Sequence, residues 1–146
     1  MPRYPVRQPD GQLAIWSTIV DHFVGFDYTA DEATDELARN YQSPREEIAQ
    51  RVYQVCMGVI PFDWWKDWAD CLAWALSMHG EEDEGVIEAL AMTTDAMTLR
   101  YIKQFVATCE AETTADNLRH ELAAANARTE KAEAELEHLD TVLTRY

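Results

Sequence analysis

Residues 118–146, LRHELAAANARTEKAEAELEHLDTVLTRY, decide the fold class of this chain. The stretch has neither glycine nor proline and consists mainly of Ala, Glu, Leu and Arg, which are good helix formers. Apolar and small side chains recur in it at alternating steps of four and three, which is the heptad repeat of a coiled coil. These seam positions are Leu118, Leu122, Ala125, Thr129, Ala132, Leu136, Leu139, Leu143 and Tyr146.

An isolated helix with a narrow apolar seam has little reason to stay single in water, so the seam predicts a helical partner. The partner can be a second copy of the chain, a fold-back of the same chain, or a foreign helix. In a parallel pair of copies, Arg128 would face Glu133 favourably, whereas Glu135 would face Asp140 unfavourably. The orientation therefore stays open, and we expect a homo-oligomer, most simply a dimer. The expected oligomerisation residues are Leu118, Leu122, Ala125, Ala132, Leu136, Leu139 and Leu143.

A tryptophan-rich stretch, PFDWWKDWADCLAWALSMHG (residues 61–80), precedes the seam. Its length and its lack of β-branched residues indicate a helix, with Asp63 as the N-cap. Such a helix is apolar over most of its circumference, which predicts burial on several sides, partly against another subunit. Tryptophan is enriched at protein interfaces. The predicted partner interface consists of Trp64, Trp65, Trp68 and Trp74, and Trp74 is the strongest candidate because it lies among polar positions.

The turn GEEDEG (residues 80–85) leads into a further helix, whose acidic first residues suit the positive end of the helix dipole. Because neither glycine nor proline follows Gly85, this helix can continue into the C-terminal one without a stop. The chain is thus expected to comprise a helix-turn-helix-like domain with an N-terminal β-arm (1–58), a Trp-rich helical region (59–110) and a coiled-coil helix (111–146).

The N-terminal region begins with extended structure. RYPVRQ and QLAIWS flank the turn sequence Pro9-Asp10-Gly11, which predicts a short β-hairpin or arm. Residues 17–25 then carry Ile19, Val20 and Phe23 at helical spacing, which predicts a first helix capped by Ser17.

Two capping boxes predict the next two helices, over about residues 30–40 and 44–57. Thr29 precedes Glu32, and Ser43 precedes Glu46, so each pair can satisfy backbone N–H groups at a helix start. Pro44 is expected at the first helical position. Two short helices joined by a tight turn are typical of a helix-turn-helix.

Gly11 to Val55 resembles the small prokaryotic domain family DUF433. The resemblance rests on an extended lead with Leu13, Ala14 and Ile15, followed by STIVDHF, TADEATDELARNY and SPREEIAQRVYQV, and it covers about a third of the chain. It implies a three-helix or winged-helix, antitoxin-type DNA-binding module of a prokaryotic or phage regulator.

The net charge of −15 disfavours nucleic acid and anionic membranes as partners and favours a basic protein. If the helix-turn-helix-like unit contacts DNA, its contacts would come from the basic and amide side chains of the later helix. These residues are Arg45, Gln50, Arg51 and Gln54. Glu46 and Glu47 lie near the start of that helix, where phosphates would approach most closely.

Catalytic and metal-binding motifs are missing from the sequence. No phosphate-binding loop, dinucleotide fingerprint or nucleophile elbow occurs, and the four histidines have no metal-ligand spacing. Cys56, Cys71 and Cys109 do not fit a disulfide framework. We therefore expect no enzyme activity, no cofactor and no metal. Without a leader sequence or a membrane span, the chain is expected to be cytoplasmic.

These observations predict a mostly α-helical, acidic, oligomeric protein-interaction module of prokaryotic or phage origin that binds or modulates a protein partner. Two alternatives stay open: a dimeric, antitoxin-like DNA-binding transcriptional regulator, and a structural homo-oligomer.

Overall fold

A computed structural model of the chain describes residues 3–59 and 67–145. The described residues form three strands and five helices, which confirms the predicted, mostly helical fold class. The chain divides into two units, Met1–Val106 and Ala107–Tyr146. In chain order the elements are β1 (Arg3–Arg7), β2 (Leu13–Ser17), β3 (His22–Tyr28), α1 (Ala30–Asn40), α2 (Arg45–Cys56), α3 (Trp68–His79), α4 (Glu84–Met92) and α5 (Ala96–Arg145).

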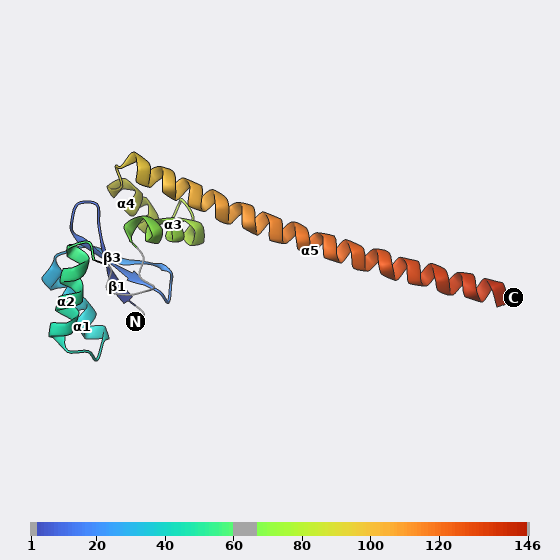
Figure 1. Cartoon of the computed structure of the whole chain (residues 1–146), viewed down its shortest axis with the longest axis horizontal. Coiled ribbons are helices and arrows are strands. Elements are labelled where there is room, and N and C mark those ends of the chain that lie inside the picture. Colours follow the sequence, from blue (N-terminus) through green and yellow to red (C-terminus); the bar gives the residue numbers. More distant parts are fainter. Residues whose placement is uncertain (1–2, 60–66, 146) are drawn as a thin grey trace. The chain divides into compact units, whose positions relative to one another are not determined.

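The three strands form an antiparallel sheet in the order β1-β2-β3, with β2 in the centre (Figure 1). The predicted hairpin is confirmed, since Arg3 pairs with Ser17 and Arg7 pairs with Leu13. Gly11 occupies the left-handed region in the turn, with φ of 89°. Glycine adopts this conformation without a steric penalty, which explains its place in the turn.

The prediction of a first helix over residues 17–25 is wrong, because this segment forms the β2–β3 turn and the start of β3. Phe23 is buried whereas Val24 is exposed, which is the alternation of a strand. The Phe23 ring packs edge-on against Trp16 of β2, with 5.0 Å between centroids. Aromatic and β-branched residues favour strands when a neighbouring strand offers such contacts.

Strand β2 is buried on both faces and therefore separates two apolar clusters. Leu13 and Ile15 pack with α1 and α2, whereas Ala14 and Trp16 pack with α3, α4 and the start of α5. Helices thus cover both faces of the sheet (Figure 1). Each large side chain buried in this way contributes on the order of 1.5–3 kcal/mol to folding.

Helix α1 begins with the predicted capping box. The Thr29 hydroxyl accepts the Glu32 N–H at 3.2 Å, and the Glu32 carboxylate accepts the Thr29 N–H at 3.4 Å. At the next helix the predicted capping box of Ser43 and Glu46 is wrong, and the helix begins one residue later than predicted. Pro44 is the extended N-cap of α2, so it is not the first helical residue, and no side chain caps this helix start.

Helix α3 begins at Trp68, where the Asp67 carboxylate caps it by accepting the Asp70 N–H at 2.9 Å. The predicted helix start at Asp63 lies outside the described residues.

Helices α4 and α5 are separate, so the helix predicted to follow the turn 80–85 is interrupted at residues 93–95, and only its second part, α5, continues into the C-terminal region. The Asp95 carboxylate accepts the Thr98 N–H at 3.0 Å and the Thr98 hydroxyl at 2.7 Å, and it thereby caps a new helix start. From Ala96 onward, α5 continues without a break to Arg145 and carries the heptad positions from Leu118 to Leu143 on one helix, whereas the predicted last position, Tyr146, lies outside the described residues. Within the described residues, no helix combines the length and the apolar character that crossing a membrane requires.

Candidate interaction surfaces

The heptad seam is an exposed apolar stripe along α5. Its five leucines expose between 56% and 73% of their surface in the single chain. Fully burying one exposed leucine side chain contributes on the order of 1.5–3 kcal/mol, so this stripe leaves a substantial apolar surface in water in the single chain. The leucines concerned are Leu118, Leu122, Leu136, Leu139 and Leu143.

The centre of the seam is built from small side chains. Ala125 and Ala132 flank Thr129, whose hydroxyl donates a hydrogen bond to the Ala125 carbonyl at 3.1 Å. This local bond satisfies the hydroxyl proton within the helix, so burial of Thr129 against a partner leaves no unpaired donor. The centre of the seam can therefore be covered without leaving the Thr129 hydroxyl proton unpaired.

Charged side chains border the seam and give this part of the chain an acidic surface. Residues 107–146 contain nine acidic and four basic residues. Arg119 and Asp116 form an ion pair within the helix at 2.9 Å, but their side chains are 76% and 66% exposed. Such an exposed pair contributes little to stability, and Arg119 can exchange it for a carboxylate on a partner.

Trp68 lies in the core, which corrects its prediction as a partner-interface residue. It is 7% exposed, its indole N–H donates to the Thr93 hydroxyl at 2.9 Å, and its ring packs 4.9 Å from that of Phe23. Trp74 is half-buried and packs against Phe105, with 6.4 Å between ring centroids. The other two predicted interface residues, Trp64 and Trp65, lie outside the described residues.

The four side chains proposed for DNA contact all lie on α2. Arg45, Gln50 and Gln54 are exposed, and Arg51 is half-buried. The Arg45 guanidinium lies 2.6 Å from the Asp35 carboxylate of α1, so its charge is already balanced. The four residues therefore share α2, and the first of them, Arg45, is paired with the acidic Asp35.

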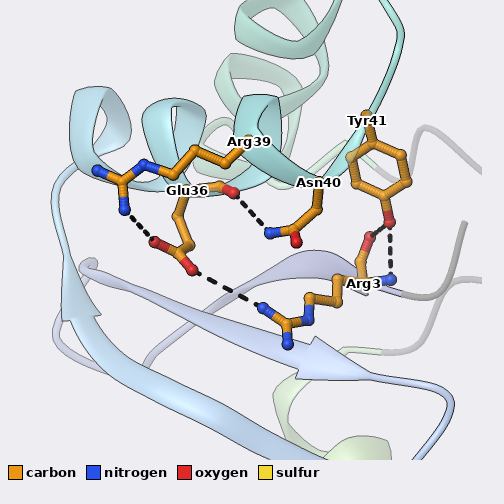
Figure 2. A network of polar contacts seen from close by, with 5 residues as sticks. All are labelled: Arg3, Glu36, Arg39, Asn40 and Tyr41. Carbon is orange, nitrogen blue, oxygen red and sulfur yellow. Dashed lines mark hydrogen bonds and ion pairs between the residues drawn. The ribbon is translucent and has the colours of Figure 1, made fainter.

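A polar network ties β1 to the end of α1 (Figure 2). The Glu36 carboxylate lies 3.7 Å from Arg3 and 3.2 Å from Arg39, and the Asn40 side chain donates to the Glu36 carbonyl. The Tyr41 hydroxyl accepts the Arg3 N–H at 2.7 Å and donates to the Arg3 carbonyl. Burial raises the pKa of Tyr41, which keeps the hydroxyl a donor. The network thus satisfies backbone groups at the outer edge of β1.

Two histidines and an aspartate connect β3 with the end of α3 and the start of α4. His22 Nε2 lies 2.6 Å from the Asp83 carboxylate, and its Nδ1 accepts the Phe23 N–H at 2.8 Å. His79 stacks on His22 with 4.4 Å between ring centroids. The hydrogen bonds from His22 and from the Val86 N–H hold the pKa of Asp83 below its usual value. Both ring nitrogens of His22 are engaged, so neither offers a free lone pair for acid–base chemistry.

A cleft of about 600 Å³ opens between the β1–β2 turn, the start of α3 and the α4–α5 junction. Its acidic walls come from Asp67 and Asp95, and both carboxylates are occupied as helix caps. No group of three or more His, Cys, Asp or Glu side chains in residues 3–59 and 67–145 is placed to hold a metal ion.

Comparisons with protein families, curated proteins and solved structures found no match to this chain. The resemblance of residues 11–55 to DUF433 therefore rests on the sequence alone.

Proposed function

We propose that this protein is an acidic, non-enzymatic interaction module that self-associates through the seam of α5 and binds a protein partner. The observation that carries the proposal is the row of exposed leucines on one continuous helix. A lone helix with this pattern leaves apolar surface in water that pairing would remove. The charge supports a basic partner, because the whole chain carries −15.

The molar mass of the full chain in solution, measured by light scattering, tests the self-association. We expect a mass of at least two chains of 16.7 kDa, most simply that of a dimer. Replacing Leu122 and Leu139 by Gln should yield a monomer, because both seam positions lose apolar contact while helix propensity stays similar. The matched control replaces Ala123 and Thr141 by Gln. Both residues lie outside the seam, so this variant should keep the wild-type mass. A monomeric wild type over micromolar concentrations would refute the proposal.

A dimeric, antitoxin-like DNA-binding regulator is the second candidate. The exposure of Arg45, Gln50 and Gln54 on α2 favours it, whereas the Asp35–Arg45 ion pair and the net charge oppose it. A gel-shift titration with mixed DNA fragments at low salt separates the candidates. A shift with steep salt dependence would support the regulator, and no shift at micromolar protein would exclude it. A structural homo-oligomer would keep its assembly and bind neither DNA nor a protein.

A further inference from the structure

We propose that two copies of the chain pair antiparallel along residues 118–143 of α5, with Leu118 of one copy opposite Leu143 of the other. This inference rests on the self-association proposed above and specifies its geometry. It follows from the order of large, small and charged side chains on the helix, all of which belong to the unit Ala107–Tyr146.

In an antiparallel coiled coil, each a position faces a d position of the partner helix. With Leu122, Leu136 and Leu143 at a and Leu118 and Leu139 at d, a single alignment pairs the leucine-rich ends of the seam with each other. The facing pairs are then Leu118 with Leu143, Leu122 with Leu139, Ala125 with Leu136, and Thr129 with Ala132, each formed twice by symmetry.

The antiparallel alignment also distributes side-chain volume better. In a parallel, in-register pair, Ala125, Thr129 and Ala132 would each face themselves, which leaves three consecutive layers without a large side chain. In the antiparallel pair Ala125 faces Leu136, so only the two central Thr129–Ala132 layers lack one. Packing large residues against small ones fills the interface more evenly and leaves fewer voids.

The charges beside the seam favour the same alignment. In an antiparallel pair, e positions face e positions and g positions face g positions, which brings Arg119 opposite Asp140 and Arg128 opposite Glu135. The remaining flanking pairs are Glu121 with Val142 and Asn126 with Glu133, so no like charges face each other.

A parallel pair has a different charge balance. It would place Arg128 opposite Glu133 but Glu135 opposite Asp140, so a repulsive pair offsets the attractive one.

Charge reversal at one position distinguishes the two orientations by the sign of its effect. In the antiparallel dimer, Glu135→Arg would bring residue 135 of each copy, now positive, opposite Arg128 of the other copy. These two repulsive pairs should raise the dissociation constant about tenfold. In a parallel dimer the same change would replace repulsion with Asp140 by attraction, and the dissociation constant would fall. Arg128→Glu combined with Glu135→Arg should restore the wild-type value in the antiparallel dimer. The control, Glu130→Arg, makes the same change in net charge outside the interface and should have little effect.

Spin-label distances provide an independent readout on the full chain. With Cys56 and Cys109 replaced by Ser and the buried Cys71 retained, labels are placed at Ala127 or at Thr141, both on the outer face of the helix. At 1.5 Å per residue, antiparallel copies separate the Thr141 labels by about 30 Å along the axis but the Ala127 labels by only about 10 Å. Equal distances at the two sites would overturn the proposed orientation.

The two proposals fail in different ways. A wild-type chain that remains monomeric at all concentrations refutes the self-association. A stable dimer that Glu135→Arg strengthens keeps the self-association and refutes the antiparallel alignment.

Discussion

Removal of the hydrogen bond between Trp68 and Thr93 tests whether this bond stabilises the core of the N-terminal unit. The Trp68 indole N–H donates to the Thr93 hydroxyl at 2.9 Å, and this hydroxyl donates to the Ala89 carbonyl at 2.9 Å. Both bonds are buried. Thr93→Val retains the shape of the side chain but removes the acceptor from the indole and the donor from the carbonyl.

An unsatisfied buried donor costs about 1–3 kcal/mol, so Thr93→Val should lower the free energy of unfolding by about 2 kcal/mol. Urea unfolding followed by tryptophan fluorescence measures this change. All variants are compared at one protein concentration, since self-association stabilises the folded state by mass action. The urea dependence of the unfolding free energy should stay unchanged, because the substitution does not alter the surface exposed on unfolding.

A double-mutant cycle with Trp68→Phe isolates the hydrogen bond. Once the indole donor is gone, Thr93→Val should cost at least about 1 kcal/mol less than in the wild type. Thr94→Val, at the exposed neighbouring position, is the control and should change stability by less than about 0.5 kcal/mol. Additive effects of the two substitutions, or a wild-type stability for Thr93→Val, would show that the Trp68–Thr93 bond does not stabilise the core.

Three further perturbations follow from the polar contacts. Because the pKa of Asp83 is lower in the folded than in the unfolded chain, the ionised carboxylate stabilises the fold fully above pH 3.8, and this stabilisation is lost as the pH falls through the pKa of the folded state. Asp83→Asn should therefore lose less stability on acidification than the wild type does, as measured by acid unfolding followed by circular dichroism. Gly85→Ala should destabilise the wild type in urea unfolding, because the new Cβ would lie 2.7 Å from His22 Cε1. It should destabilise a His22→Ala background less, because there the Asp83 carboxylate at 3.3 Å is the close contact that remains and the gain in helix propensity opposes it. The hydrogen bond to Asp70 raises the pKa of Tyr101 to about 12, so absorbance titration of Asp70→Asn, with Tyr101→Phe as the reference, should show this tyrosine ionising at lower pH.

The sequence predicted the elements whose signals are local. The β1–β2 hairpin followed from its turn residues, and the start of α1 followed from Thr29 and Glu32. Strand β3 was missed because its apolar residues happen to fit a helical spacing. The uninterrupted apolar run Leu13–Trp16 held the missing signal, since a strand buried on both faces is a central strand and requires a neighbour on each edge.

The tryptophan-rich helix shows what periodicity leaves undecided. A helix that is apolar over most of its circumference can be buried in its own chain or against a partner. Here the helix is buried in its own chain, because Trp68, Cys71 and Leu72 pack against the face of the sheet that carries Ala14 and Trp16. The predicted β1–β2 hairpin supplies part of this face, but the sequence did not predict β3, whose Phe23 completes the face and packs 4.9 Å from Trp68.

Because most of α3 is buried or half-buried in its own chain, α5 is the better candidate for an interaction surface. Exposed apolar residues of the first unit, such as Ile19 in a turn, Tyr53 on α2 and Ile87 on α4, lie on different elements, and scattered exposure of this kind is ordinary in a folded protein. The seam leucines instead repeat along one face of one helix, at the spacing that interlocks with another helix. The proposed pairing of α5 would account for this regularity, because it gives one reason for the leucines, the small central residues and the charges beside them.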